Sequence, residues 1–191
     1  MGSLELIIGP MFSGKTKLLI SRYKEITNTT SNTSNNILVI NYYKDTRYSS
    51  NSIVSHDGES IPAINMSVIN NIFYLYNESN FNNFNNYNYI IINEGQFFPD
   101  LKDAVIKLIE LYNKNVVICG LDCDYKQEKF GQIWDLIPHA DKLIKLQGKC
   151  NNCSNKSLFT HRLTNEVSQE LIGTHNYIPV CRKCYNDYKL L

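Results

Sequence analysis

The chain has 191 residues, of which 43% are hydrophobic, and its 19 basic residues nearly balance 18 acidic ones for a formal charge of +1. This balance provides no basic field of the kind that nucleic-acid-binding proteins use, so nucleic acid is not expected as a partner. No apolar run approaches the ~20 residues of a membrane span, and the N-terminal stretch MGSLELIIGP lacks the basic region and long apolar stretch of a secretion signal. We therefore expect a cytoplasmic protein without a membrane partner.

Five apolar runs have the length of buried β-strands, and two segments between them have helical periodicity. The predicted strands are LELII (4–8), ILVIN (37–41), YIIIN (89–93), NVVICG (115–120) and KLIKL (142–146). The predicted helices, KTKLLISRYKEI (15–26) and DLKDAVIKLIELYNK (100–114), space their apolar residues three and four apart, as helices packed on a sheet do. This alternation predicts an α/β domain over residues 1–146, with a largely parallel sheet that carries helices on both faces.

The stretch GPMFSGKT follows the first predicted strand and opens the first predicted helix, which is the context of a phosphate-binding P-loop. In such a loop, backbone N–H groups and the helix N-terminus favour a phosphate chain, Lys15 reaches the terminal phosphates, and the Thr16 hydroxyl can bind Mg²⁺. An ordinary glycine-rich turn is the alternative, and the flanking strand and helix disfavour it. The residues predicted to bind the nucleotide are Gly9, Pro10, Met11, Phe12, Ser13, Gly14, Lys15 and Thr16.

An acidic residue is expected at the end of a second buried strand, because P-loop enzymes place there an acid that supports Mg²⁺ and a group that activates the nucleophile. The strand YIIIN instead ends in Asn93 and is followed by Glu94. The Asn93 amide oxygen can accept a hydrogen bond from a metal-bound water, but it brings no charge to Mg²⁺. Glu94 is therefore the better candidate for the general base, with a solvent-facing loop carboxylate as the alternative.

Two cysteine pairs lie in the last part of the chain, where short polar segments replace the long apolar runs. Cys150 and Cys153 are separated by two residues, as are Cys181 and Cys184, with 27 residues between the pairs. This spacing is typical of a closed four-thiolate Zn²⁺ site, which is structural because it leaves no position open for a substrate. A disulfide framework and free core thiols are the alternatives; the absence of a secretion signal disfavours the first and the paired spacing the second. We predict a small zinc-ribbon domain over residues 147–191.

Several motifs occur together in the order, and near the spacing, of a known family of thymidine kinases from animal cytosol, many bacteria and large DNA viruses. They are GPMFSGKT, YKDTRYSS (43–50), NEGQFFPD (93–100), GLDCDYKQEKFG (120–131), FTHRL (159–163) and the two cysteine pairs. The chain resembles this family over nearly its whole length. The resemblance implies a P-loop α/β domain joined to a zinc-bound domain whose lasso-like loop closes over the nucleoside, usually in a homotetramer. It also implies transfer of the γ-phosphoryl group of ATP to the 5′-hydroxyl of thymidine or deoxyuridine, in nucleotide salvage.

The resemblance also assigns residues to the two substrates. Those implied beside the ATP phosphates, in addition to the P-loop, are Asp45, Thr46, Arg47, Asn93, Glu94, Gly95 and Gln96, with Glu94 as the proton acceptor. Those implied around the nucleoside are Phe97, Leu121, Tyr125, Phe130, Thr160, Gln169, Glu170, Leu171, Ile172, Gly173 and Tyr177. Residues 169–173 would contact the nucleoside through backbone groups, within a loop of residues 163–176, and Tyr177 would meet the sugar. For the aromatic and aliphatic members, ordinary core packing is the alternative.

Three further residues, Asn93, Arg47 and Arg162, bear on how the phosphate charge is neutralised. The family commonly has Asp where this chain has Asn93, so Mg²⁺ support is expected from Thr16, water and the ATP phosphates, with Asp45 nearby. Because phosphoryl transfer relies mostly on positioning and charge neutralisation, this departure should weaken the reaction rather than abolish it. Arg47 and Arg162 could neutralise developing phosphate charge, and a solvated surface charge is the alternative for each.

Two other classes of protein share part of this pattern. A zinc-ribbon ATPase acting on nucleic acid would carry the P-loop and the cysteine pairs, but it should also show a basic face and further motor motifs, which we do not find in the sequence. A catalytically silent nucleotide-binding protein would follow if Asn93 prevented the reaction. Of these three classes, only a kinase would use ATP to convert a nucleoside into its monophosphate.

Overall fold

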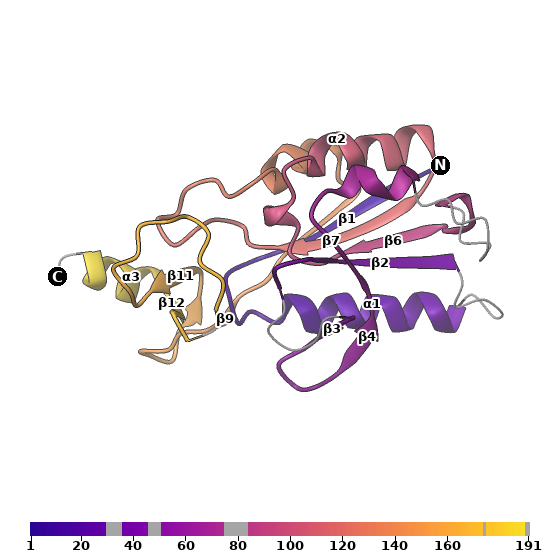
Figure 1. Cartoon of the computed structure of the whole chain (residues 1–191). Helices are drawn as coiled ribbons and strands as arrows, with labels where there is room; N and C mark the ends of the chain where they lie inside the picture. The colour runs from indigo at the N-terminus through magenta and orange to yellow at the C-terminus, as the bar shows by residue number, and fades with distance from the viewer. Residues whose placement is uncertain (30–35, 46–50, 75–83, 174, 190–191) are drawn as a thin grey trace.

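The computed structural model describes residues 1–29, 36–45, 51–74, 84–173 and 175–189 (Figure 1). Its centre is a six-stranded sheet in the order β5-β2-β6-β7-β1-β8, in which every neighbouring pair is parallel. The strands are β1 (Ser3–Ile8), β2 (Ile37–Tyr42), β5 (Ile64–Met66), β6 (Tyr89–Ile92), β7 (Asn115–Gly120) and β8 (Lys142–Lys145). The five predicted strands and the parallel sheet are confirmed, and the short β5 extends the sheet beyond them.

Helices cover both faces of the sheet, with α1 (Lys15–Thr29) below it and α2 (Leu101–Ile106) above it in Figure 1. Successive residues of a strand point to opposite faces, so strands that are apolar throughout supply two cores. In β1, Leu6 belongs to the core cluster that includes Leu101 of α2, whereas the next residue, Ile7, belongs to the cluster that includes Leu19 of α1. The continuous apolar runs in the sequence therefore reflect a sheet that is buried on both sides.

The second predicted helix is less regular than its apolar spacing suggests. α2 ends at Ile106 and passes into a π-helical turn, η5 (Lys107–Leu111), in which the Tyr112 N–H donates to the Lys107 carbonyl at 3.1 Å. Within this turn Leu111 is exposed, whereas Leu108 stays in the core. A spacing of three and four residues predicts a helix here, but it does not reveal this turn.

Several short elements complete the α/β part. β3 (Ser52–Val54) and β4 (Ser60–Pro62) form an antiparallel hairpin, and its Ile53 and Ile61 join the core cluster of α1. The 3₁₀ turns are η2 (Ile69–Tyr74), η3 (Phe84–Asn86), η4 (Gly95–Phe97) and η6 (Ile133–His139). None of the helices described is both long and apolar enough to span a bilayer.

The C-terminal part lies beyond the carboxyl ends of β1, β6 and β7 (Figure 1). It contains β9 (Gly148–Lys149), β10 (Lys156–Ser157), β11 (Phe159–Arg162), β12 (Tyr177–Val180) and α3 (Arg182–Lys189), and its strands pair as antiparallel hairpins. A small core of its own includes Val180, Tyr185 and three of the paired cysteines. The predicted boundary near residue 146 falls between the end of β8 and the start of β9.

Candidate active site

A cavity of about 420 Å³ lies where the P-loop and the ends of β2 and β6 meet the C-terminal part. Most residues predicted for the site line this cavity: Met11, Phe12, Ser13, Gly14, Lys15, Thr16, Asp45, Asn93, Glu94, Gln96, Phe97, Leu121, Tyr125, Phe130, Thr160, Gln169, Leu171, Ile172, Gly173 and Tyr177. Four predicted residues are not in its lining: Gly9, Pro10, Gly95 and Glu170. Thr46 and Arg47 lie outside the described residues. One cavity thus joins the predicted phosphate loop to the predicted nucleoside residues.

The P-loop leaves β1 and enters α1 with an unusual backbone. Phe12 has a φ of 60°, in the left-handed region, and a side-chain carbon at Gly9 would lie 2.6 Å from the Leu146 carbonyl oxygen. The Lys15 amine donates to the Pro10 carbonyl at 2.7 Å, and the Met11 N–H donates to Thr160 Oγ1 of β11 at 2.9 Å. The loop is thereby held between the sheet and the C-terminal part.

The chemistry of this loop fits a phosphate chain. The N-terminus of the 15-residue helix α1, with Lys15 as its first residue, favours an anion. The Ser13 Oγ is buried and has no hydrogen-bond partner among the described residues. A buried hydroxyl without a partner is costly, and a phosphate oxygen beside it would satisfy it. The donors and the positive charge thus point to ATP phosphates at this end of the cavity.

Glu94 follows β6 and faces the cavity in a fixed position. Its backbone is left-handed, with a φ of 54°, and its Oε2 accepts a hydrogen bond from Gln96 Nε2 at 2.7 Å. Gln96 is buried, and its Oε1 accepts from the Leu121 N–H at 3.0 Å. The carboxylate is therefore tied, through one amide side chain, to the loop that follows β7, rather than pointing into solvent from a free loop.

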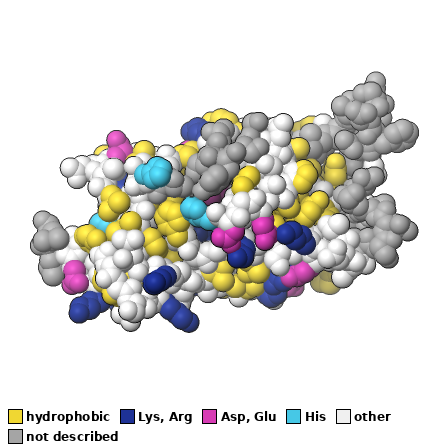
Figure 2. Space-filling view, turned by 90° about the horizontal axis from the view of Figure 1, so that it is seen from below, with side chains coloured by type: hydrophobic (Ala, Val, Ile, Leu, Met, Phe, Trp, Pro, Cys, Tyr) yellow, Lys and Arg dark blue, Asp and Glu magenta, His cyan; other side chains and the backbone are white. Residues whose placement is uncertain are grey.

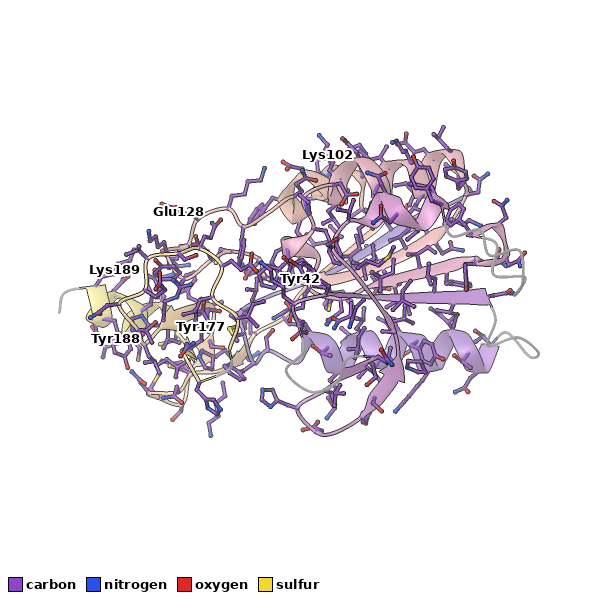
Figure 3. All side chains as sticks on the ribbon, viewed as in Figure 1. Tyr42, Lys102, Glu128, Tyr177, Tyr188 and Lys189 are labelled. Carbon is purple, nitrogen blue, oxygen red and sulfur yellow. The ribbon has the colours of Figure 1, made fainter. Side chains whose placement is uncertain are left out.

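Aromatic side chains form the wall next to Glu94. Phe97 stacks on Tyr42 with ring centroids 4.9 Å apart, and it meets Phe130 edge to face at 5.3 Å. Figure 3 labels Tyr42, which lies at the end of β2, and Tyr177 in the C-terminal part. Phe97, Phe130 and Tyr177 line the cavity while packing with their neighbours, so core packing and a ligand-binding wall are compatible here. A planar apolar wall suits a nucleoside base.

The four paired cysteines come together in the C-terminal part. Their Sγ atoms all lie within 4.8 Å of one another, with Cys153 at 3.6 Å from Cys181 and 3.8 Å from Cys184. Zn–S bonds of ~2.3 Å in a tetrahedron place sulfur atoms about 3.8 Å apart, so these cysteines could hold a zinc ion. All six cysteines of the chain are free, which excludes the disulfide alternative.

The segment of residues 163–173 borders the cavity without forming a helix or strand. Gln169 donates from Nε2 to Asp124 Oδ2 at 2.8 Å, whereas Glu170 lies at the surface and pairs with Lys44 at 3.3 Å. Arg162, at the start of the segment, is only 4% exposed and bonds to carbonyl oxygens of the segment. The alternative of a solvated surface charge is therefore wrong for Arg162.

Comparisons with known proteins support the same assignment. The family model described as thymidine kinase matches residues 2–185. A thymidine kinase of Oryza sativa subsp. japonica is 38% identical over all of this chain and 68% of its own length, and thymidine kinase a of Arabidopsis thaliana is 37% identical over 96% of this chain and 75% of its own. The cytosolic thymidine kinase of Homo sapiens is 34% identical over 96% of this chain and 73% of its own length. The chain belongs to the thymidine kinase family.

A solved structure of another kind adds nothing to this assignment. Domain III of the Thermotoga maritima replication initiation protein DnaA covers 75% of this chain and 54% of its own, at 17% identity and a TM-score of 0.41. A similarity this low indicates neither a shared function nor a shared family. The thymidine kinase family, by contrast, implies ATP as the phosphate donor and a nucleoside as the acceptor.

Asn93 is buried at the end of β6 and uses both ends of its amide. Its Nδ2 donates to Asn41 Oδ1 at 2.8 Å, and its Oδ1 accepts from the Cys119 thiol at 3.0 Å. Burial raises the pKa of Cys119 to about 12, so this thiol stays protonated and able to donate. Asn41 in turn donates to the Asp45 carbonyl at 3.2 Å. The Asn93 amide is thus bonded at both ends to neighbouring strands.

Some residues that line the cavity were not predicted as site residues, although Cys123 and Asp124 lie within the motif GLDCDYKQEKFG. They are Lys17, Asn41, Ser52, Ile53, Val54, Ser55, His56, Asp57, Cys123 and Asp124, which line the cavity beside the predicted residues. Six of them come from the β3–β4 hairpin, whose three-residue strands are too short to give a periodic pattern. On the face seen in Figure 2, which carries α1 and this hairpin, basic and acidic side chains are interspersed, and Lys and Arg form no continuous patch.

Proposed function

We propose that this chain is a kinase that transfers the γ-phosphoryl group of ATP to the 5′-hydroxyl of thymidine, and also of deoxyuridine, in nucleotide salvage. The observation that carries the proposal is the single cavity in which the P-loop, Glu94 and the aromatic wall adjoin. An enzyme that transfers a phosphoryl group directly between two substrates must hold both of them together, shielded from water. Family membership supports the same reaction.

At the donor end, the P-loop holds the phosphates of ATP. Backbone N–H groups of the loop and the N-terminus of α1 bind the chain, the Ser13 hydroxyl accepts or donates one further bond, and Lys15 exchanges its bond to the Pro10 carbonyl for the terminal phosphates. Thr16 and Asp45 line the cavity and would hold Mg²⁺, which, when bound, neutralises charge on the phosphates. Gly9 and Pro10 shape the loop from outside the cavity.

At the reacting centre, Glu94 accepts the proton of the 5′-hydroxyl. Gln96 holds one carboxylate oxygen at 2.7 Å, which orients the group in the cavity for proton transfer. The proton leaves the hydroxyl as its oxygen bonds to the γ-phosphorus and as the bond from that phosphorus to the ADP oxygen breaks. The products are the nucleoside monophosphate and ADP.

At the acceptor end, Phe97, Phe130, Tyr125 and Leu121 enclose the base, and Tyr177 lies beside the sugar. Backbone groups of residues 169–173 bind the nucleoside from the other side, while the Glu170 side chain stays at the surface with Lys44. The four cysteines hold a structural Zn²⁺ that stabilises this C-terminal part. Residues 1–146 and 147–191 form two domains around the cavity, in a cytoplasmic homotetramer.

The test is an incubation of the purified chain with γ-labelled ATP, Mg²⁺ and a panel of nucleosides, one at a time. We expect label in thymidine and deoxyuridine monophosphates and little in the purine nucleosides. Label released as inorganic phosphate, stimulated by nucleic acid, would instead identify an ATPase. Binding of ATP without any transfer would identify a silent binding protein. Native mass spectrometry of the same sample checks the tetramer and the zinc content.

A further inference from the structure

Arg162 is the last residue of β11 and lies at the root of the segment 163–173. Its side chain is buried beside the cavity, at 4% exposure. A buried guanidinium needs several acceptors, because an unpaired charge is costly away from water. The hydrogen-bond acceptors of the Arg162 guanidinium therefore indicate which part of the protein this side chain stabilises.

Those acceptors belong almost entirely to the segment. Arg162 Nη1 donates to the carbonyl oxygens of Glu166, at 2.8 Å, and Ser168, and Nη2 donates to the carbonyl of Gln169 at 3.1 Å. Nη2 also donates to the Tyr177 hydroxyl at 2.6 Å, which itself donates to the Leu171 carbonyl at 2.9 Å. One guanidinium and one phenol thus set the backbone of residues 166–171.

Tyr125 completes this arrangement from the loop after β7. The Arg162 guanidinium lies over its ring at 3.7 Å from the centroid, a favourable stacking contact. The Tyr125 hydroxyl donates to the Val167 carbonyl at 3.2 Å, and the Tyr125 carbonyl accepts from the Tyr185 hydroxyl at 2.7 Å. Tyr125 is therefore bonded through its carbonyl to α3, through its ring to the guanidinium and through its hydroxyl to the segment.

We propose that Arg162 and Tyr125 form a latch that positions residues 166–171 over the cavity, so that the nucleoside meets a preformed backbone. The proposal rests on the function proposed above, in which this segment binds the nucleoside. Apolar burial does little for the segment, since Leu163 and Val167 are 52% and 76% exposed. The guanidinium spreads five N–H donors over a rigid planar fork and can bond carbonyls that lie apart, whereas the three donors of a Lys ammonium all leave one nitrogen atom.

The same contacts argue against a role of Arg162 at the phosphates. Both Nη atoms are occupied by segment carbonyls and the Tyr177 hydroxyl. Loss of a latch raises the fraction of open segment, which weakens nucleoside binding and therefore raises KM. Loss of a group that stabilises the transition state lowers kcat instead. The two roles are therefore separable in kinetics.

The first experiment needs no enzymatic activity. The full-length zinc-loaded protein is digested with a protease specific for glutamate, and cleavage after Glu166 and Glu170 is followed by mass spectrometry, with the exposed Glu59 as internal reference. Cleavage in a segment that opens and recloses rapidly tracks its open population. We expect Arg162→Lys to speed segment cleavage by about 10- to 100-fold, the effect of losing one charged hydrogen bond, and Tyr125→Phe by about 2- to 10-fold.

The matched control is Arg182→Lys. Arg182 also lies over an aromatic ring of the C-terminal part, Phe159, at 4.9 Å, but it is exposed. It should leave segment cleavage and the steady-state constants unchanged. If Arg162→Lys loses zinc or unfolds, Tyr125→Phe, which keeps the guanidinium and removes one hydroxyl, decides the matter alone.

The second experiment measures steady-state kinetics of the same variants. We expect Arg162→Lys to raise the KM for thymidine in proportion to the loss of closed segment, by at most the about 10- to 100-fold rise in segment opening, with kcat, the KM for ATP and the zinc content close to those of Arg182→Lys. Unchanged segment cleavage, or a fall in kcat at constant KM, would overturn the latch. If the natural protein phosphorylates no nucleoside, the proposed function fails, and the proteolysis still decides whether the latch exists.

Discussion

The two ends of the cavity are built in different ways. At the phosphate end, the P-loop and Glu94 follow β1 and β6, whose inner residues Leu6, Ile7, Ile91 and Ile92 are fully buried in the parallel sheet. At the nucleoside end, residues 166–171 have no regular structure and are held by side chains that bond to their carbonyls. The rigid end suits chemistry, which needs fixed distances, and the polar end suits a segment that must open for substrate and product.

Removal of the zinc ion that the C-terminal part is expected to hold should affect the nucleoside end far more than the phosphate end. Structural zinc contributes roughly 10–16 kcal/mol in small zinc peptides, far more than the polar contacts of the segment. We expect Cys153→Ser to lose zinc and all thymidine binding, while the α/β part keeps its secondary structure and still binds ATP. Metal analysis, circular dichroism and calorimetry with each substrate measure the three quantities. Ser154→Ala, at an exposed neighbour of Cys153 that belongs neither to the cysteine cluster nor to the cavity lining, serves as the control.

A smaller but more specific effect is expected at Glu94. Glu94→Gln keeps an oxygen to accept the Gln96 bond but cannot take a proton, so turnover should fall by ~10²- to 10⁴-fold. Binding of ATP and thymidine should remain near normal, since the fold at this end depends on the sheet. Rapid-quench kinetics and calorimetry test both halves. Near-normal turnover would remove Glu94 from its role as the base.

The support of Glu94 can be tested through Gln96. Gln96→Leu removes the bond to Glu94 and leaves the Leu121 N–H without its side-chain acceptor, which should cost about 1–3 kcal/mol of folding stability. Turnover should fall by about 10-fold, as expected when a positioned base is less well oriented. Gln132→Leu, which removes a comparable bond to the Lys102 N–H away from the cavity, should lower stability without the same loss of turnover. Equal effects of the two variants on turnover would contradict the positioning role.

The smallest expected effect concerns Asn93. Asn93→Asp brings back the family's charge, so half-maximal activity should need less free Mg²⁺. The substitution also removes the donor that bonds to Asn41, and it should cost about 1–3 kcal/mol of folding stability. Mg²⁺ titration and thermal unfolding measure the two effects. Asn41→Asp, which puts the charge at the other end of the same bond, tests whether any carboxylate here suffices. An unchanged Mg²⁺ requirement in Asn93→Asp would mean that residue 93 does not support the ion.

The sequence predicted the rigid end better than the polar end, for physical reasons. A P-loop and a pair of cysteines are local patterns, and a strand buried on both faces shows itself as a continuous apolar run, so Lys15, Glu94 and Cys150 could be singled out from their neighbours. The bond between Asn41 and Asn93 joins residues 52 positions apart, and the bond between Gln169 and Asp124 joins residues 45 apart. Such pairs depend on the folded arrangement of the sheet and leave no periodic signal.

Resemblance to the family supplied residues 169–173 and Tyr177, but not what holds them. The segment looks polar and featureless in the sequence, and only its contacts with Arg162 and Tyr125 explain how it keeps a shape. The β3–β4 hairpin was missed for a related reason, because each of its strands has only three residues.

In the proposed reaction, one cavity holds both substrates on either side of Glu94. The most direct test is binding of a single molecule in which adenosine and thymidine are joined through their 5′ oxygens by a polyphosphate chain. We predict that one such molecule binds per chain, that it displaces both ATP and thymidine, and that it binds more tightly than either because the two halves are linked. Displacement of only one of the two substrates would mean that ATP and thymidine do not share this cavity.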